Sequence, residues 1–276
     1  MRSKMIPSRP RGYALVTVLW MGLGLLLGAA AFLSESRQSA LGARAEIEAA
    51  RALELARSGI NFAMADLGRV GESAPKSRRD GTWVELRMAE GRVRYAIRDE
   101  NGKVDINAAP VQLLRPVFEA IGAEAGFDAF DASNLAEAVV SIRQSRGQLD
   151  LAQLLAEVGL DARTVTIARR YLTSFNFDPQ VNPLTAPEVV LRAVPGLGPN
   201  DVATLMSIRQ TGGALPRLGT ASLWLVALEG PVFTIEAEAE LEGGATASMQ
   251  VRLIQQGLSF RGGKMLYEVV STSIQF

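Results

Sequence analysis

The chain of 276 residues contains no cysteine and no histidine. Without cysteine, its fold is not held together by disulfide bonds. Without histidine, it lacks the residue that most often serves as general base and metal ligand. It also lacks a phosphate-binding loop of the Gly-Lys-Ser/Thr type, and its serines and carboxylates are scattered without a catalytic spacing. These absences favour a structural or binding protein over an enzyme.

Acidic residues are missing from the N-terminal part of the chain, where the first one is Glu35. Residues 13–33 carry no charge, and at about 1.5 Å per helical residue they can cross a hydrocarbon core of about 30 Å. Signal peptides have apolar runs of only about 7 to 15 residues, and no small-residue cleavage site follows Ala31, so we expect a retained anchor. By the positive-inside rule, the basic residues ahead of the anchor keep the N-terminus cytoplasmic; these are Arg2, Lys4, Arg9 and Arg11.

The junction between Gly12 and Tyr13 resembles the cleavage site of a type IV prepilin, with an ordinary signal anchor as the alternative. In that family, a prepilin peptidase removes a short basic leader ending in glycine, and the new N-terminus is methylated. The resemblance implies cleavage between Gly12 and Tyr13 and N-methylation of Tyr13. Four of the 29 basic residues lie in residues 1–12, so the cleaved chain keeps 25 basic against 29 acidic residues, a net charge of about −4. A mildly acidic chain binds nucleic acid poorly.

The fifth residue after the predicted cleavage site is Thr17, whereas most prepilins carry glutamate there. A carboxylate among apolar helices costs free energy unless it meets a positive partner. In the family, that partner is the amino terminus of a subunit already in the filament. A subunit that starts the filament has no such partner, so the uncharged Thr17 favours a position at the tip.

Helical and strand patterns follow the anchor. Residues 34–68 have a helical period and are expected to continue residues 13–33 as one long helix, with apolar residues at Leu41, Ile47, Leu53, Leu55, Ile60, Phe62 and Met64. Alternating residues then predict a hairpin over 84–97, with Gly91 in the left-handed position of a three-residue turn. Three more strands are expected over 233–241, 247–253 and 265–276, with Arg252 across from a row of glutamates. Strands before and after a helical region predict an interrupted sheet.

The helical region contains an internal duplication. Ser141-Ile142-Arg143-Gln144 recurs as Ser207-Ile208-Arg209-Gln210, and a glycine and a leucine follow each copy, Gly147 and Leu149 in the first and Gly213 and Leu215 in the second. Upstream of each lies an asparagine, Asn107 or Asn182, and then an Ala-Pro pair ending at Pro110 or Pro187. Proline fits the first turn of a helix, so each pair predicts a helix start.

The second copy includes Val194-Pro195-Gly196-Leu197-Gly198-Pro199-Asn200-Asp201, which resembles the hairpin of a helix-hairpin-helix element. DNA-binding versions place the glycine amides on a phosphate beside lysine or arginine. Here Asp201 follows and no lysine occurs up to Gly212. We therefore interpret the glycines as a tight interhelical turn.

Taken together, the order of these parts resembles the minor pseudopilin family called general secretion pathway protein K, most specifically in residues 107–114 and in the large insert. The resemblance implies an α+β fold: a type IV pilin-like long N-terminal helix packed on an antiparallel sheet, with an inserted all-α domain containing the duplicated helix-hairpin-helix-like unit. Its parts would be a leader (1–12), the transmembrane (13–33) and amphipathic (34–68) halves of the helix, the first strands of the head (81–104), the insert (105–228) and the closing strands (229–276).

The same resemblance implies a non-enzymatic role at the tip of the type II secretion pseudopilus, in the bacterial inner membrane with a periplasmic head. The implied partners are two other minor pseudopilins, the major pseudopilin, the prepilin peptidase, the inner-membrane assembly platform and membrane lipid, but no nucleic acid. Some family members bind calcium, but no loop here has a coordination spacing, and we interpret Asp99-Glu100-Asn101-Gly102 as a polar turn. Two alternatives remain: a minor pilin of a type IV pilus, and a membrane-anchored DNA-binding protein that uses the hairpin.

Overall fold

The computed structural model describes residues 13–69, 77–126, 131–148, 150–258 and 265–275. The predicted leader, with Gly12, and Leu149 of the first repeat lie outside the described residues. The chain divides into two compact units, Met1–Arg51 and Ala52–Phe276, and each is described by itself.

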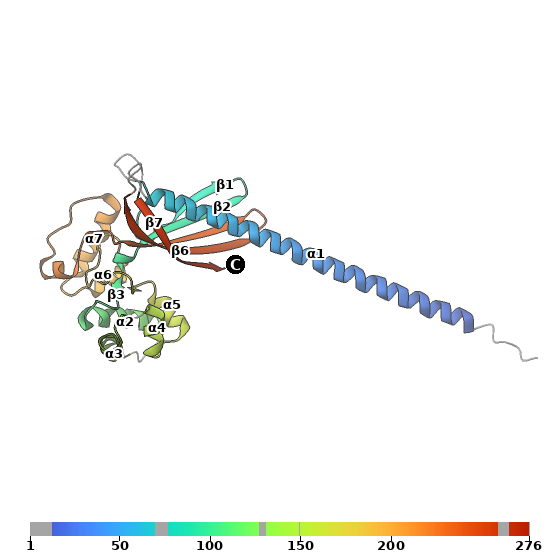
Figure 1. The fold of residues 1–276 in the computed structure, drawn as a ribbon, viewed down its shortest axis with the longest axis horizontal. Coiled ribbons are helices and arrows are strands. Elements are labelled where there is room, and N and C mark those ends of the chain that lie inside the picture. Colours follow the sequence, from blue (N-terminus) through green and yellow to red (C-terminus); the bar gives the residue numbers. More distant parts are fainter. Residues whose placement is uncertain (1–12, 70–76, 127–130, 149, 259–264, 276) are drawn as a thin grey trace, which may run out of the picture. The chain divides into compact units, whose positions relative to one another are not determined.

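The first unit contains most of α1 (Tyr13–Leu67), which is a single α-helix as predicted (Figure 1). The helix includes an apolar window with a mean hydropathy of 2.1, and none of that window is buried. By length and composition, α1 is therefore able to cross a membrane.

The second unit contains the last turns of α1, which pack on the sheet with one face. The buried residues recur every three or four positions, as expected for an amphipathic helix, and they are Ala52, Leu55, Ala56, Ile60, Ala63 and Leu67. Of the apolar residues predicted to face the core, Leu55 and Ile60 are buried, Leu53 and Met64 are partly buried, and Phe62 is exposed. In the first unit, Leu41 and Ile47 are exposed as well.

Gly59 marks the closest approach of α1 to the sheet. A Cβ atom added there would lie 2.7 Å from Cγ2 of Val93 and 3.1 Å from Cβ of Ala237. Only a residue without a side chain allows the helix backbone to come this near to two strands.

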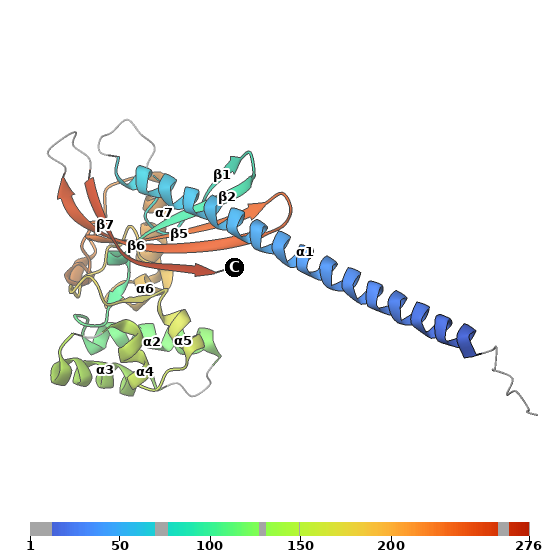
Figure 2. The same ribbon diagram turned by 45° about the vertical axis from the view of Figure 1, so that its right-hand side comes forward.

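The sheet has five antiparallel strands in the order β1-β2-β5-β6-β7 (Figures 1 and 2). The strands are β1 (Val84–Met88), β2 (Gly91–Asp99), β5 (Val232–Leu241), β6 (Thr246–Leu258) and β7 (Met265–Gln275). Because β2 pairs directly with β5, the residues between them form an insert into the sheet, which confirms the predicted interruption.

Two local predictions about the sheet are wrong. The turn at Gly91 has two residues instead of the predicted three, because Met88 pairs with Gly91, although Gly91 does have a positive φ, of +158°. Glycine is also needed there for a second reason, because an added Cβ would lie 2.2 Å from the carbonyl oxygen of Glu240 on β5. Arg252 pairs with Thr234, not with a glutamate, because the register places uncharged Gln250 and Ser248 opposite Glu236 and Glu238.

The insert builds its own core on the side of the sheet opposite to the packed turns of α1 (Figure 2). Its largest fully buried side chains include Phe118, Ile121 and Leu154. Its elements are η1 (Glu100–Gly102), β3 (Val104–Asp105), α2 (Val111–Ala125), α3 (Ala132–Arg146), α4 (Leu151–Glu157), α5 (Ala162–Ala168), β4 (Leu172–Thr173), α6 (Glu188–Ala193), α7 (Pro199–Thr211) and η2 (Gly219–Trp224). The predicted fold class, a long helix on an antiparallel sheet with a helical insert, is confirmed.

Candidate functional site

The first candidate site is the start of α1. Tyr13 is its first residue, with 79% of its surface exposed, and Thr17 lies one turn later. The hydroxyl of Thr17 donates a hydrogen bond of 2.8 Å to the carbonyl oxygen of Tyr13. A threonine can satisfy its own hydroxyl in this way within the helix, whereas a carboxylate, which only accepts, cannot bond to a carbonyl. Thr17 therefore needs no partner from another chain.

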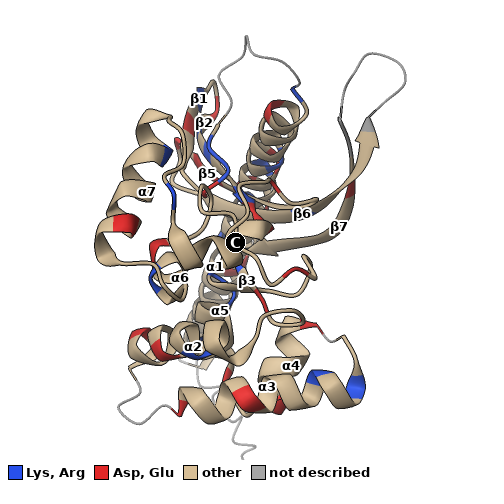
Figure 3. Cartoon of the chain, turned by 90° about the vertical axis from the view of Figure 1, so that its left-hand side faces the viewer, with Lys and Arg blue, Asp and Glu red and all other residues tan. Residues whose placement is uncertain are grey.

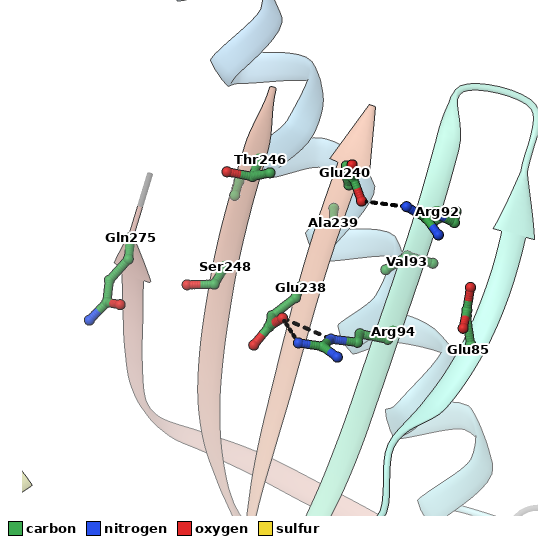
Figure 4. A pocket seen from close by; sticks show the side chains of 11 residues that line it. Glu85, Arg92, Val93, Arg94, Glu238, Ala239, Glu240, Thr246, Ser248 and Gln275 are labelled. Carbon is green, nitrogen blue, oxygen red and sulfur yellow. Dashed lines mark hydrogen bonds and ion pairs between the residues drawn. The ribbon is translucent and has the colours of Figure 1, made fainter. Parts of the chain in front are cut away.

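The second candidate site is a groove of about 620 Å³ on the polar face of the sheet (Figure 4). Three arginines of β2 form ion pairs across the strand boundary with three glutamates of β5. The distances are 2.8 Å for Arg92–Glu240, 2.5 Å for Arg94–Glu238 and 3.6 Å for Arg98–Glu236. The first two pairs line the groove together with Glu85, Thr246, Ser248 and Gln275, among others, whereas the Arg98–Glu236 pair does not line it. Exposed pairs of this kind add little stability. Because Glu85 joins two glutamates and two arginines, the groove carries charges of both signs with a small acidic excess.

The third candidate site is the turn where β2 enters the insert. The sequence predicted a polar turn here, and the structure has a short 3₁₀ helix whose residues are buried. Asp99 accepts hydrogen bonds from the backbone N–H groups of Asn101 and Gly230, both at 3.0 Å. Its other oxygen accepts from the side chains of Asn182 and Thr185, at 3.0 and 3.1 Å. Burial raises the pKa of Asp99, and these four donors act against that rise. The turn thus ties the sheet to both ends of the insert.

Glu100 and Lys103 form a buried ion pair beside Asp99. Lys103 Nζ lies 2.8 Å from Glu100 Oε1, and their side chains are 9% and 1% exposed. Thr234 of β5 and Thr173 of β4 donate to the two oxygens of Glu100 at 2.6 and 2.7 Å. Burial favours a higher pKa of Glu100, but the charge of Lys103 and these hydrogen bonds outweigh it, so the pKa is lowered. The carboxylate therefore stays ionised in the interior.

These carboxylates do not fit the calcium ion that the family resemblance suggested. Calcium takes carboxylate and carbonyl oxygens that are free to coordinate it, whereas both oxygens of Asp99 and both oxygens of Glu100 already accept hydrogen bonds from the chain. Among the described residues, no group of three or more acidic side chains is placed to hold a metal ion.

The duplication recognised in the sequence has a structural basis in two arginines. Arg143 of α3 donates to the carbonyl oxygens of Ile106 and Ala109, at 2.9 and 2.6 Å. Arg209 of α7 donates to those of Pro183 and Ala186, at 2.8 and 2.7 Å. In each copy, the two carbonyls lie four residues and one residue before the proline that caps the first helix. Each arginine therefore holds the chain in the turn that leads into its own helix pair.

One detail of the predicted repeat is wrong. The residue of the first copy that is equivalent to Asn182 is Asp105, not Asn107. Each of the two side chains accepts a hydrogen bond from the N–H group two residues later: Asp105 from Asn107 at 2.7 Å, and Asn182 from Leu184 at 3.0 Å. Asp105 also accepts from the N–H groups of Asn176 and Phe177. Asparagine and aspartate both form this turn. The equivalent residues of the two copies therefore differ in type, and residue identity alone pointed to an asparagine two positions too late.

The hairpin between α6 and α7 is a tight interhelical turn, as predicted. Gly196 has a φ of +83°, and an added Cβ would lie 2.7 Å from Oγ1 of Thr220 in η2. The N–H group of Gly198 donates to Asp201 Oδ2 at 2.9 Å. Both glycines of the motif thus face groups of this chain, and acidic and basic residues are interspersed along the helices of the insert (Figure 3).

No protein-family model matches the chain, and no curated protein matches it. Among solved structures, the chain is similar to a chain in the crystal structure of the GspK-GspI-GspJ complex from the type 2 secretion system of enterotoxigenic Escherichia coli. The two share 16% sequence identity with a TM-score of 0.47, over 88% of this chain and 99% of that chain.

Proposed function

We propose that this protein is a minor pseudopilin of the general secretion pathway protein K family. In this role it stands at the tip of the type II secretion pseudopilus, helps to initiate its assembly and supports protein export across the outer membrane. The observation that carries the proposal is the combination, in one chain, of an apolar N-terminal helix with an uncharged fifth residue and a sheet interrupted by a helical insert.

The contact of Thr17 supports a first position in the filament. Its hydroxyl is satisfied by the carbonyl of Tyr13 in the same helix. A subunit with glutamate at this place would need a positive group from a preceding subunit, since an unpaired carboxylate among apolar helices is costly. A subunit with threonine inserts its helix without that partner.

The insert supports the same position. It begins after Asp99 of β2, ends before Val232 of β5, and has its own hydrophobic core beside the sheet. A subunit inside a filament must leave room for neighbours on several sides, whereas a subunit at the tip has none ahead of it. A bulky insert is therefore compatible with the tip and unfavourable within the shaft.

The proposal includes processing and placement. Prepilin peptidase would cleave between Gly12 and Tyr13, Tyr13 would be methylated, and α1 would anchor the protein in the inner membrane with its head in the periplasm. The partners would be two other minor pseudopilins at the tip, the major pseudopilin below them and the assembly platform. The groove of ion pairs on β2 and β5 carries charges of both signs, so another head can pack on it without a large charge imbalance.

The proposal is tested by Thr17→Glu, with Thr17→Ala as the matched control. If Thr17 allows the protein to go first, the glutamate variant forms fewer pseudopili per cell than the wild type, and the alanine variant forms as many. Pseudopili are counted by electron microscopy at equal protein levels. A glutamate variant that initiates as well as the wild type would contradict the proposed role of this residue.

Two other functions are separated by their partners. A minor pilin of a type IV pilus would co-purify with pilus subunits, whereas a pseudopilin co-purifies with two other minor pseudopilins of a secretion system. A DNA-binding protein of the helix-hairpin-helix type would retain DNA in a salt-dependent way. The internal hydrogen bond of Gly198 to Asp201 argues against the second alternative.

A further inference from the structure

A small cavity of about 160 Å³ lies where the polar face of β6 and β7 meets the insert, away from the groove of ion pairs. Arg252 of β6 pairs with Ser271 of β7, and Gln250 pairs with Ser273, so these four side chains share one face of the sheet. The insert contributes Lys103 and Arg169 from the other side. The lining is thus rich in hydrogen-bond donors.

Arg252 is held in an unusual way. Its guanidinium lies 4.2 Å from the centre of the Phe175 ring, so the ring covers one flat side of the group. Its Nε atom is buried and has no hydrogen-bond acceptor among the described residues. Buried donors nearly always have a partner in folded proteins. Stacking on an aromatic ring occupies the face of a guanidinium and leaves the N–H groups in its plane available to an anion.

The acidic residues at the cavity are already engaged. Glu100 accepts from Lys103 and from two threonines, and Asp150 accepts a hydrogen bond of 2.8 Å from the N–H group of Ala152 as the N-cap of α4. Arg169 is exposed and forms no ion pair with a described residue. Arg169 and Arg252 therefore bring positive charge to the cavity, and in the described part of the chain no acidic residue forms an ion pair with either of them.

We propose that this cavity binds an oxyanionic group of the size of a carboxylate or a phosphate. The guanidinium groups of Arg252 and Arg169 would hold its oxygens, and the hydroxyls of Ser271 and Ser273 would complete the shell. The volume sets the size of the ligand: drug-sized molecules occupy pockets of about 300 to 1,000 Å³, whereas about 160 Å³ admits only a small group. This inference does not depend on the proposed function.

The test uses the full-length protein in a neutral detergent, with inorganic phosphate and acetate as probes. The midpoint of thermal unfolding is measured while each anion replaces chloride at constant ionic strength. A site that binds only the folded protein gives a rise in the midpoint that follows a saturation curve. Saturation by acetate assigns the site to carboxylates as well as phosphates, and saturation by phosphate alone assigns it to phosphates.

Three variants locate the effect. Arg169→Gln removes an exposed side chain, so it keeps the fold, and it should raise the half-saturating anion concentration about tenfold, the change expected when a charge-assisted hydrogen bond is lost. Arg252→Gln should raise the half-saturating anion concentration by at least the same factor. Arg217→Gln is the matched control, because Arg217 is also exposed but lies outside the cavity, and it should leave the curve unchanged. The inference is overturned if the wild type shows no saturation, or if Arg169→Gln and Arg252→Gln respond like Arg217→Gln.

Discussion

Glu100 shows how a single residue links the sheet to the insert. Its oxygens receive donors from β5, from β4 and from Lys103, so three segments far apart in the sequence meet at one carboxylate. A buried ion pair is stable only while both partners are charged and every polar atom is satisfied. The residue is therefore a sensitive point for the stability of the whole head.

Glu100→Gln should destabilise the folded protein by about 3 to 5 kcal/mol, because it leaves the buried ammonium of Lys103 without a counter-charge. The control is Glu240→Gln, which breaks the exposed pair with Arg92 and should cost less than about 1 kcal/mol. The free energy of unfolding is measured in urea for both variants. Equal losses in the two variants would show that the Glu100 pair behaves as a surface pair.

The same residue gives a pH dependence with a definite sign. The pKa of Glu100 lies below its ordinary value of 4.5, so its contribution to stability is present above that value and is lost as the pH falls through the folded-state pKa. The difference in unfolding free energy between the wild type and Glu100→Gln should therefore shrink on acidification. Burial raises the pKa of Asp99 and Asp105, so these two groups change the stability with pH in the opposite direction to Glu100. Both proteins contain them, so their contributions cancel in the difference between the wild type and the variant. A difference that stays constant or widens at low pH would contradict this assignment.

At the scale of elements, the two copies of the helical unit depend on equivalent arginines. Arg143→Gln or Arg209→Gln should each cost about 1 to 3 kcal/mol, because two carbonyls lose a charged donor in a partly buried turn. Arg192→Gln is the control, since Arg192 forms only an exposed pair with Glu188 and should cost less than about 1 kcal/mol. Urea denaturation of the three variants provides the comparison. If Arg143→Gln costs no more than Arg192→Gln, the arginine does not hold the turn.

The packing of α1 on the sheet depends on the missing side chain of Gly59. Gly59→Val should destabilise the head by about 1 to 3 kcal/mol through overpacking, which exceeds the few tenths of a kcal/mol that valine gains over glycine in a helix. Gly42→Val is the control, because no other group lies within 4 Å of an added Cβ at that position. The midpoints of thermal unfolding are compared. Similar midpoints for the two variants would mean that α1 can move away from the sheet at little cost.

Local periodicity predicted the elements well, and contacts between distant residues explain the errors. The alternation in β2 and β5 identified both strands, but it did not indicate which strand would face the glutamates. The register places Arg92, Arg94 and Arg98 there instead of Arg252, and register depends on the pairing of the complete sheet. In the same way, the polar turn at Asp99 was predicted, but its burial depends on Asn182 and Thr185.

At the scale of the whole molecule, the sequence predicted an interrupted sheet and a duplicated insert, and both are present in the structure. The cavity at Arg252 was not predicted, because it forms only where β6, β7 and the insert meet. A partial signal was available in Ser271 and Ser273, which lie two residues apart on the last strand and therefore share one face of it. Their role depends on strand pairing, which a single sequence does not reveal.

The central claim is that the chain follows the pilin route to the membrane and becomes a tip subunit. The most direct measurement is the N-terminal sequence and mass of the protein extracted from membranes of cells that contain a prepilin peptidase. The account predicts a chain that starts at Tyr13 with a methylated amino group. A chain that starts at Met1, or one that starts beyond Ala31, would contradict it.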